Sequence, residues 1–244
     1  DVRDESGHHA LSARLAKFAQ KAGEIVERRH RGMLIYAGGD DVLAFVCVED
    51  AVACAKALAE AFSHEMGRGF SLSVGLGMGH VLESMGDLLG LGRKAEQVAK
   101  KQRNSLAIVV DKRSGGESCW TTTWSEDPQH ILNECMGLLG EDLSSGKVYE
   151  VRDLMRRLPK PEQLTTAPDQ QAWERILRQD VERTLAHGGM NTGRSLRKGL
   201  PFVRQGASYR ERLDEANDWV ERMLIARFLS GAALGKRPET PRDA

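Results

Sequence analysis

The tetrapeptide Gly-Gly-Asp-Asp at residues 38–41 constrains the fold of this chain most strongly. Apolar runs at residues 33–37 and 42–48 stand on either side of it. Two apolar runs joined by a short Gly- and Asp-rich connection are typical of a β-hairpin, because these residues adopt the backbone conformations that a tight turn needs. The sequence therefore predicts two antiparallel strands that carry two glycines and two carboxylates at their tip.

The elements around this hairpin predict an α+β fold. Apolar residues recur at three- and four-residue steps over residues 7–29, which predicts an amphipathic helix before the hairpin. The elements predicted after it are a helix over 50–64, a strand over 70–78, a helix over 84–102 and a strand over 106–110. This order is that of a ferredoxin-like βαββαβ unit whose first strand is missing, followed by a trailing element. We assign this unit to residues 1–125.

The sequence pattern over residues 126–244 predicts a second, all-helical domain. Pro159, Pro161 and Pro168 mark a linker inside it. The predicted helices cover residues 127–139, 144–157, 173–186 and 209–229. No strand pattern is found in this half of the chain, so we expect a helical domain that follows the mixed one.

Composition narrows the possible environments and partners. The chain of 244 residues has 35 basic and 35 acidic residues, so no overall positive charge points to nucleic acid. No apolar run approaches the roughly 18 residues that a membrane-spanning helix needs, and no signal-peptide pattern opens the sequence. The four cysteines lack C-x-x-C spacing and are expected to be reduced thiols. We therefore expect a cytoplasmic protein with no membrane partner.

The chemistry of the predicted hairpin tip points to a nucleotide and a metal ion. Gly38 and Gly39 would let a phosphate approach the backbone closely. Asp40 and Asp41 supply the hard oxygen ligands that Mg²⁺ or Mn²⁺ takes together with a nucleoside triphosphate. The same four residues are also good turn formers without any catalytic role, and this alternative stays open.

Six segments of the chain carry a family resemblance. They are Ser6–Leu15, Leu34–Phe45, Ser71–His80, Ala99–Ile108, Arg113–Gly116 and Ala226–Leu229. Together they resemble the large subunit of type III CRISPR effector complexes, in particular its type III-B (Cmr) branch. The resemblance covers nearly the whole chain. It implies a palm domain, of the kind shared by nucleotide cyclases and polymerases, followed by the helical last domain of that family. The strand with a D-x-D carboxylate pattern that precedes the first helix in the family is not in this chain.

The resemblance implies an enzyme that makes a cyclic oligoadenylate second messenger from ATP by two-metal 3′–5′ nucleotidyl transfer when target RNA is bound. It assigns catalysis and the binding of Mg²⁺ or Mn²⁺ to Asp40 and Asp41. It also places Gly38 and Gly39 against the triphosphate and gives Lys100 the role of neutralising phosphate charge. From the residues alone, Lys100 is equally well an exposed lysine near the end of a helix.

The resemblance also implies partners in antiviral defence. These are the other subunits of the complex, ATP as the substrate, and guide RNA and target RNA, which are reached mostly through the complex. Two alternatives remain. One is a non-catalytic scaffold subunit of the same complex. The other is a diguanylate-cyclase-like enzyme, although Asp41 and Val42 stand where that family usually has Glu and Phe.

Overall fold

The computed structural model describes residues 5–112, 116–141, 143–186, 202 and 206–234. The chain divides into two compact units, one up to Gln129 and one from His130 to Leu234. The first unit combines helices with two small sheets, and the described part of the second is helical. The predicted α+β class is confirmed. The assignment of domains to residues 1–125 and 126–244 stays a prediction.

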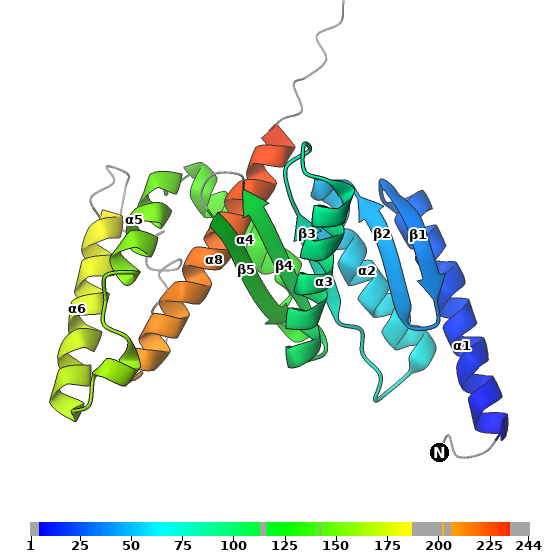
Figure 1. Cartoon of the computed structure of the whole chain (residues 1–244), viewed down its shortest axis with the longest axis horizontal. Coiled ribbons are helices and arrows are strands. Elements are labelled where there is room, and N and C mark those ends of the chain that lie inside the picture. The colour runs from blue at the N-terminus through cyan, green and yellow to red at the C-terminus, as the bar shows by residue number, and fades with distance from the viewer. Residues whose placement is uncertain (1–4, 113–115, 142, 187–201, 203–205, 235–244) are drawn as a thin grey trace, which may run out of the picture. The chain divides into compact units, whose positions relative to one another are not determined.

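The elements of the first unit follow the predicted order with one addition (Figure 1). They are α1 (Glu5–Gly23) with the π-helical turn η1 (Glu24–Arg29), β1 (Gly32–Gly38), β2 (Asp41–Val46), α2 (Val48–Met66), β3 (Val74–Met78), α3 (Met85–Gln102), β4 (Ser105–Lys112), β5 (Gly116–Thr123) and the 3₁₀ turn η2 (Trp124–Glu126). The addition is β5, which the sequence analysis did not predict.

The strands form two separate sheets. β1 and β2 pair antiparallel, while β3 pairs parallel with β4, which pairs antiparallel with β5. Within the described residues, β2 pairs with β1 alone and β3 pairs with β4 alone. In a complete βαββαβ unit, the first strand lies between the strands that correspond to β2 and β3. The strand expected before α1 is thus absent from the described residues, and the two sheets share no hydrogen bonds.

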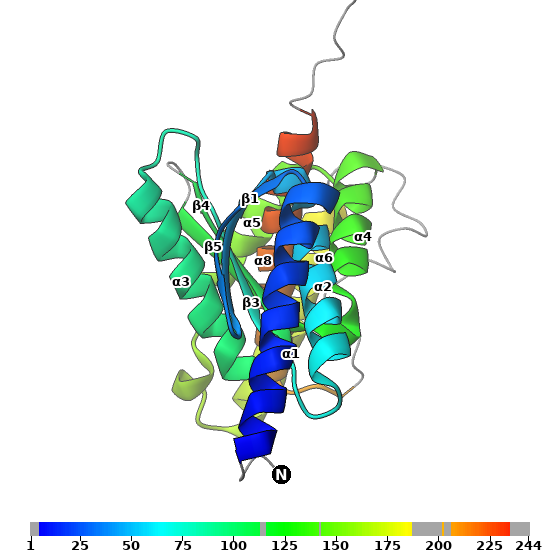
Figure 2. The same ribbon diagram turned by 90° about the vertical axis from the view of Figure 1, so that its right-hand side faces the viewer.

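Helices cover the strands of the first unit on two sides. Figure 2 shows α1 and α2 on one side of the strands and α3 on the other. Phe18 of α1 and Phe62 of α2 are buried and meet edge to face, with ring centroids 5.0 Å apart. Leu34, Val42 and Ala44 of the hairpin pack against the same core. The hairpin therefore has one face on the core, as its alternating hydrophobicity requires.

Two glycines let β3 and α3 approach closely. A Cβ atom on Gly77 would lie 2.6 Å from the carbonyl carbon of Leu91, and one on Gly75 would lie 2.5 Å from that of Ala95. Such distances are too short for any side chain, so the small residues of β3 allow close backbone packing. β3 is shorter than the predicted strand over 70–78, and the N–H of Phe70 donates to the carbonyl of Gly67 in a turn that precedes it.

The second unit consists of helices that pack against one another. They are α4 (Pro128–Glu141), α5 (Ser145–Met155), α6 (Ala167–Ala186), α8 (Tyr209–Leu234) and the 3₁₀ turn η3 (Pro161–Gln163). α5, α6 and α8 pack on each other through buried apolar side chains such as Val151, Leu177 and Met223. α6 begins earlier than the predicted residue 173, because the Thr166 hydroxyl caps its first turn by accepting from the N–H of Asp169.

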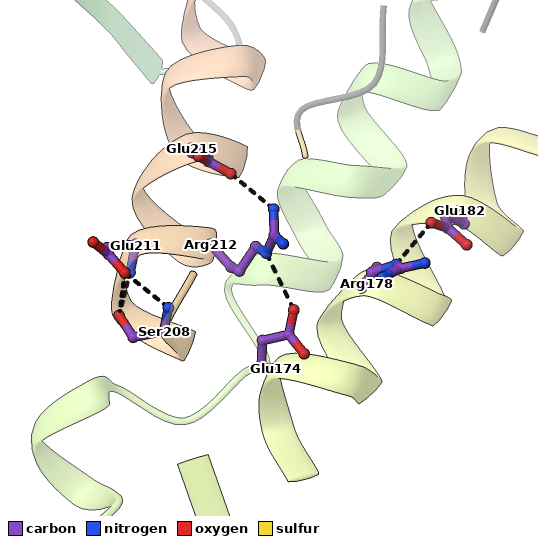
Figure 3. Close-up of polar contacts among 7 residues, drawn as sticks. All are labelled: Glu174, Arg178, Glu182, Ser208, Glu211, Arg212 and Glu215. Atoms are coloured by element: carbon purple, nitrogen blue, oxygen red, sulfur yellow. Dashed lines mark hydrogen bonds and ion pairs between the residues drawn. The ribbon is translucent and has the colours of Figure 1, made fainter. Parts of the chain in front are cut away.

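A buried arginine links two of these helices. Arg212 of α8 is only 5% exposed. Its Nε donates to Glu174 of α6 at 3.1 Å, and its Nη1 donates to Glu215 one turn further along α8 at 3.3 Å (Figure 3). The guanidinium also lies 5.6 Å from the ring centre of Phe202. One cation therefore compensates two half-buried carboxylates, which is the condition under which charges are tolerated inside a protein.

Two further features concern the cysteines and the character of the helices. No disulfide joins the four cysteines, and burial raises the pKa of the thiols of Cys54 and Cys135 to about 11. Cys47, in contrast, is exposed at the start of α2. Over the part of the chain that the structure describes, no helix has the length and apolar character needed to cross a bilayer.

Candidate functional site

The predicted glycines and carboxylates meet at the tip of the β1–β2 hairpin. Gly38 closes β1 and pairs across the tip with Asp41, the first residue of β2. Gly39 has a φ of +63°, a left-handed conformation that favours glycine in a tight turn. A Cβ atom on Gly39 would meet no atom within 4 Å, so the space beside its backbone is open. The side chains of Asp40 and Asp41 are exposed at this tip.

Lys100 approaches this tip from a distant part of the sequence. It lies in the last turn of α3, where its Nζ pairs with Oε1 of Glu96 at 2.5 Å. The hydrogen bond that Lys100 donates to Glu96 raises the pKa of Lys100, and the negative charges of Asp41 and Asp40 raise it further. Lys100 is therefore close enough to both aspartates to interact with them electrostatically. The fold thus places Lys100 of α3 within electrostatic range of the two aspartates at the hairpin tip.

A strained turn fixes the end of α3 beside the site. Arg103 and Asn104 have φ values of 59° and 46°, which are uncommon for residues other than glycine. The N–H of Arg103 donates to the carbonyl of Ala99 at 2.9 Å and closes the helix. The carbonyl of Asn104 accepts from the N–H of Trp124 at 3.1 Å. These bonds hold the last turn of α3, and with it Lys100, in a defined position.

The donor set at the tip suits an ion that is shared with a nucleotide. Mg²⁺ is bound in many proteins by one or two carboxylates, and substrate phosphates and water complete its coordination. Asp40 and Asp41 supply two such carboxylates. No cluster of three or more metal-ligating side chains occurs among the residues that the structure describes. The tip therefore fits a cation that phosphate helps to hold, and does not form a closed cage of protein ligands.

Comparison with known proteins gives one family match and two relatives. Residues 1–107 match the family model described as Cas10/Cmr2, second palm domain. The CRISPR system Cmr subunit Cmr2 of Pyrococcus furiosus is 38% identical over 118 residues. The CRISPR system single-strand-specific deoxyribonuclease Cas10/Csm1 (subtype III-A) of Enterococcus italicus is 26% identical over 153 residues.

The matches cover unequal shares of the proteins. They take in 44% and 60% of this chain, but only 13% and 19% of the Pyrococcus and Enterococcus relatives. The chain thus corresponds to less than a fifth of the length of either relative. The part of this chain that matches the family model contains the hairpin tip and all of α3, including Lys100.

Proposed function

We propose that the hairpin tip is the ATP site of a nucleotidyltransferase, because residues 1–107 match the family model of the Cas10/Cmr2 second palm domain. The full-length large subunit would join ATP molecules through 3′–5′ bonds into cyclic oligoadenylate, when its type III CRISPR complex has bound target RNA. The observation that supports this function best is the approach of Lys100 to Asp40 and Asp41. Carboxylates for a cation lie at one open tip, and the ammonium group of Lys100 lies within reach of their charge.

Each residue of the tip would make a different contact with the nucleotide or its cation. The open backbone at Gly39 lets a phosphate group approach without a side chain in its way. Asp40 and Asp41 would hold Mg²⁺ or Mn²⁺ next to that phosphate. Such an ion supplies Lewis-acid activation of the attacking 3′-hydroxyl and neutralises charge on the pyrophosphate that leaves. The aspartates keep the ion in place and orient the triphosphate for in-line attack.

Lys100 is suited to bind phosphate because its present partner holds it weakly. Its pair with Glu96 is exposed, with side chains 61% and 40% accessible. Exposed ion pairs between residues one helical turn apart contribute only about 0.3–0.5 kcal/mol. An incoming triphosphate carries more negative charge than Glu96, so exchange of partners costs little. A lysine is a compact cation that tolerates such a change of geometry.

A second candidate function rests on the donor count. The described residues offer two carboxylates at the tip and no cluster of three metal-ligating groups. The same donor count is also compatible with a scaffold subunit, which would contact other subunits and the guide RNA and perform no chemistry. The two functions differ in one prediction, because only the first requires Asp40 and Asp41 for product formation.

The test uses the full-length subunit in its RNA-guided complex, with ATP and Mg²⁺ or Mn²⁺, with and without target RNA. Mass spectrometry identifies the product. We expect adenylate oligomers only with target RNA, and none from the Asp40→Ala/Asp41→Ala variant. Asp111→Ala, an exposed carboxylate at the far end of β4, is the matched control and should retain activity. A target-bound complex that makes no oligomer would support the scaffold.

A further inference from the structure

A β-bulge turns Tyr36 to the exposed face of the hairpin. The strand register pairs Leu34 with Ala44 and then Tyr36 with Leu43, so Ile35 is an extra residue in β1. Leu34 and Ala44 pack on the core, whereas Tyr36 and Leu43 are 56% and 41% exposed. A bulge re-aims the side chains that follow it, and here it moves Tyr36 to the face away from the core.

The phenol end of Tyr36 lies against the hairpin tip. A Cβ atom on Gly38 would lie 2.5 Å from Cζ of Tyr36 and closer still to the phenol oxygen. The turn itself demands glycine only at Gly39, because Gly38 has no positive φ. A side chain at residue 38 would therefore require the phenol end of Tyr36 to move. The phenol O–H has no hydrogen-bond partner within the described part of the chain.

Tyr36 also shares its face with one of the carboxylates. Residues two apart in a strand point to the same face, and so do residues directly opposite one another in an antiparallel pair. Tyr36 and Gly38 are two residues apart in β1, and Gly38 lies directly opposite Asp41 of β2. The three residues therefore point to the same face of the hairpin. The phenol oxygen is thus beside the point where the proposed function places the triphosphate.

We infer that Tyr36 is a phosphate-binding residue of this site, whose O–H donates to a phosphate oxygen of the bound nucleotide. The inference rests on the proposed function, because it requires a triphosphate at Asp40 and Asp41. A phenol is a donor that phosphate oxygen accepts readily, and donors to charged acceptors are the stronger kind. Loss of one such bond is expected to weaken binding by about 10-fold or more.

The test measures binding of two probes to the full-length protein in its complex, with Mg²⁺ present. One probe is an ATP analogue with a methylene group between the α- and β-phosphorus atoms, and the other is inorganic tripolyphosphate. Only the binding that Asp40→Ala/Asp41→Ala removes is counted. Tyr36→Phe keeps the ring on Gly38 and removes only the hydroxyl. Tyr149→Phe, on α5 in the second unit, is the matched control.

We expect Tyr36→Phe to weaken the binding of both probes by a similar factor, at an unchanged melting temperature. Tyr149→Phe should leave the binding of both probes unchanged. Gly38→Ala displaces the ring of Tyr36 and should weaken the binding of both probes as well. If Tyr36→Phe lost binding of the ATP analogue alone, the inference would be overturned, because the contact would then lie on the nucleoside. Unchanged binding in Tyr36→Phe would also overturn it and leave the proposed function intact. A wild-type complex that binds neither probe would overturn both.

Discussion

The substitution Arg212→Ala is expected to destabilise the second unit by about 3–5 kcal/mol. The guanidinium is 5% exposed and lies within 3.3 Å of carboxylate oxygens from both Glu174 and Glu215. Its removal leaves the carboxylate of Glu174, whose side chain is only 20% exposed, without this cation, and it removes one ion pair of Glu215. The expected cost is dominated by the uncompensated carboxylate of Glu174 rather than by the lost packing of the arginine stem.

The magnitude follows from distance and burial. At 3.1 Å and an effective dielectric constant of about 20, one ion pair has a Coulomb energy of about 5 kcal/mol. Desolvation of the charges offsets much of this attraction, so the intact cluster adds little net stability. Truncation of one member removes the attraction but leaves the desolvation of the others. The combined change Arg212→Met/Glu174→Gln/Glu215→Gln should therefore recover most of the stability that Arg212→Ala loses.

The assay is hydrogen exchange with mass spectrometry over α6 and α8 across a urea series, which gives the free energy of unfolding of the second unit by itself. Arg178→Ala is the matched control. Arg178 also lies on α6 and pairs with Glu182 at 3.1 Å, but its side chain is 56% exposed (Figure 3). Its loss should cost no more than about 0.5 kcal/mol. Equal costs for Arg212→Ala and Arg178→Ala would refute the reasoning from burial.

Three further predictions concern the first unit. Gly77→Ala forces a Cβ atom against the backbone of α3 and should cost about 1–3 kcal/mol in urea unfolding, whereas Gly90→Ala, with open space around it, should be neutral or stabilising. The side chain and backbone N–H of Arg31 lower the pKa of Asp50 to about 2, so its stabilising effect is complete above about pH 4 and disappears as the pH falls toward 2. Melting temperatures of Asp50→Asn and wild type should therefore differ at neutral pH and converge at pH 2; a constant difference would contradict this. Lys100→Ala should raise the KM for ATP by about 10-fold in the full complex, and an unchanged KM would exclude a phosphate contact.

Local patterns predicted most elements of the first unit. The Gly-Gly-Asp-Asp tetrapeptide predicted the hairpin, and periodic apolar residues predicted α1, α2 and α3. β5 was not predicted because two of its inward positions are polar: Ser118 and Thr122 are buried alongside Trp120. A search for alternating hydrophobicity cannot find a strand whose buried side contains hydroxyl groups. The series of threonines and the tryptophan was the available signal, since such residues favour strands.

The candidate site shows a different limit. The glycines and aspartates were predictable as a group because they are adjacent in sequence. The approach of Lys100 to Asp40 depends on how α3 packs against β3 and β4, which no local pattern contains. The bulge at Ile35 was equally hidden, because no glycine or proline marks it. Tyr36 was therefore missed, although an aromatic residue two positions before the glycines was visible in the sequence.

The separation of the two sheets has a consequence for work with this chain by itself. β2 and β3 each present one edge whose backbone N–H and C=O groups have no strand beside them in the described structure. Such edges accept strands from other molecules and so promote self-association. Aggregation should therefore increase steeply with protein concentration. A peptide with alternating apolar residues, able to lie between β2 and β3, should act as a solubilising additive.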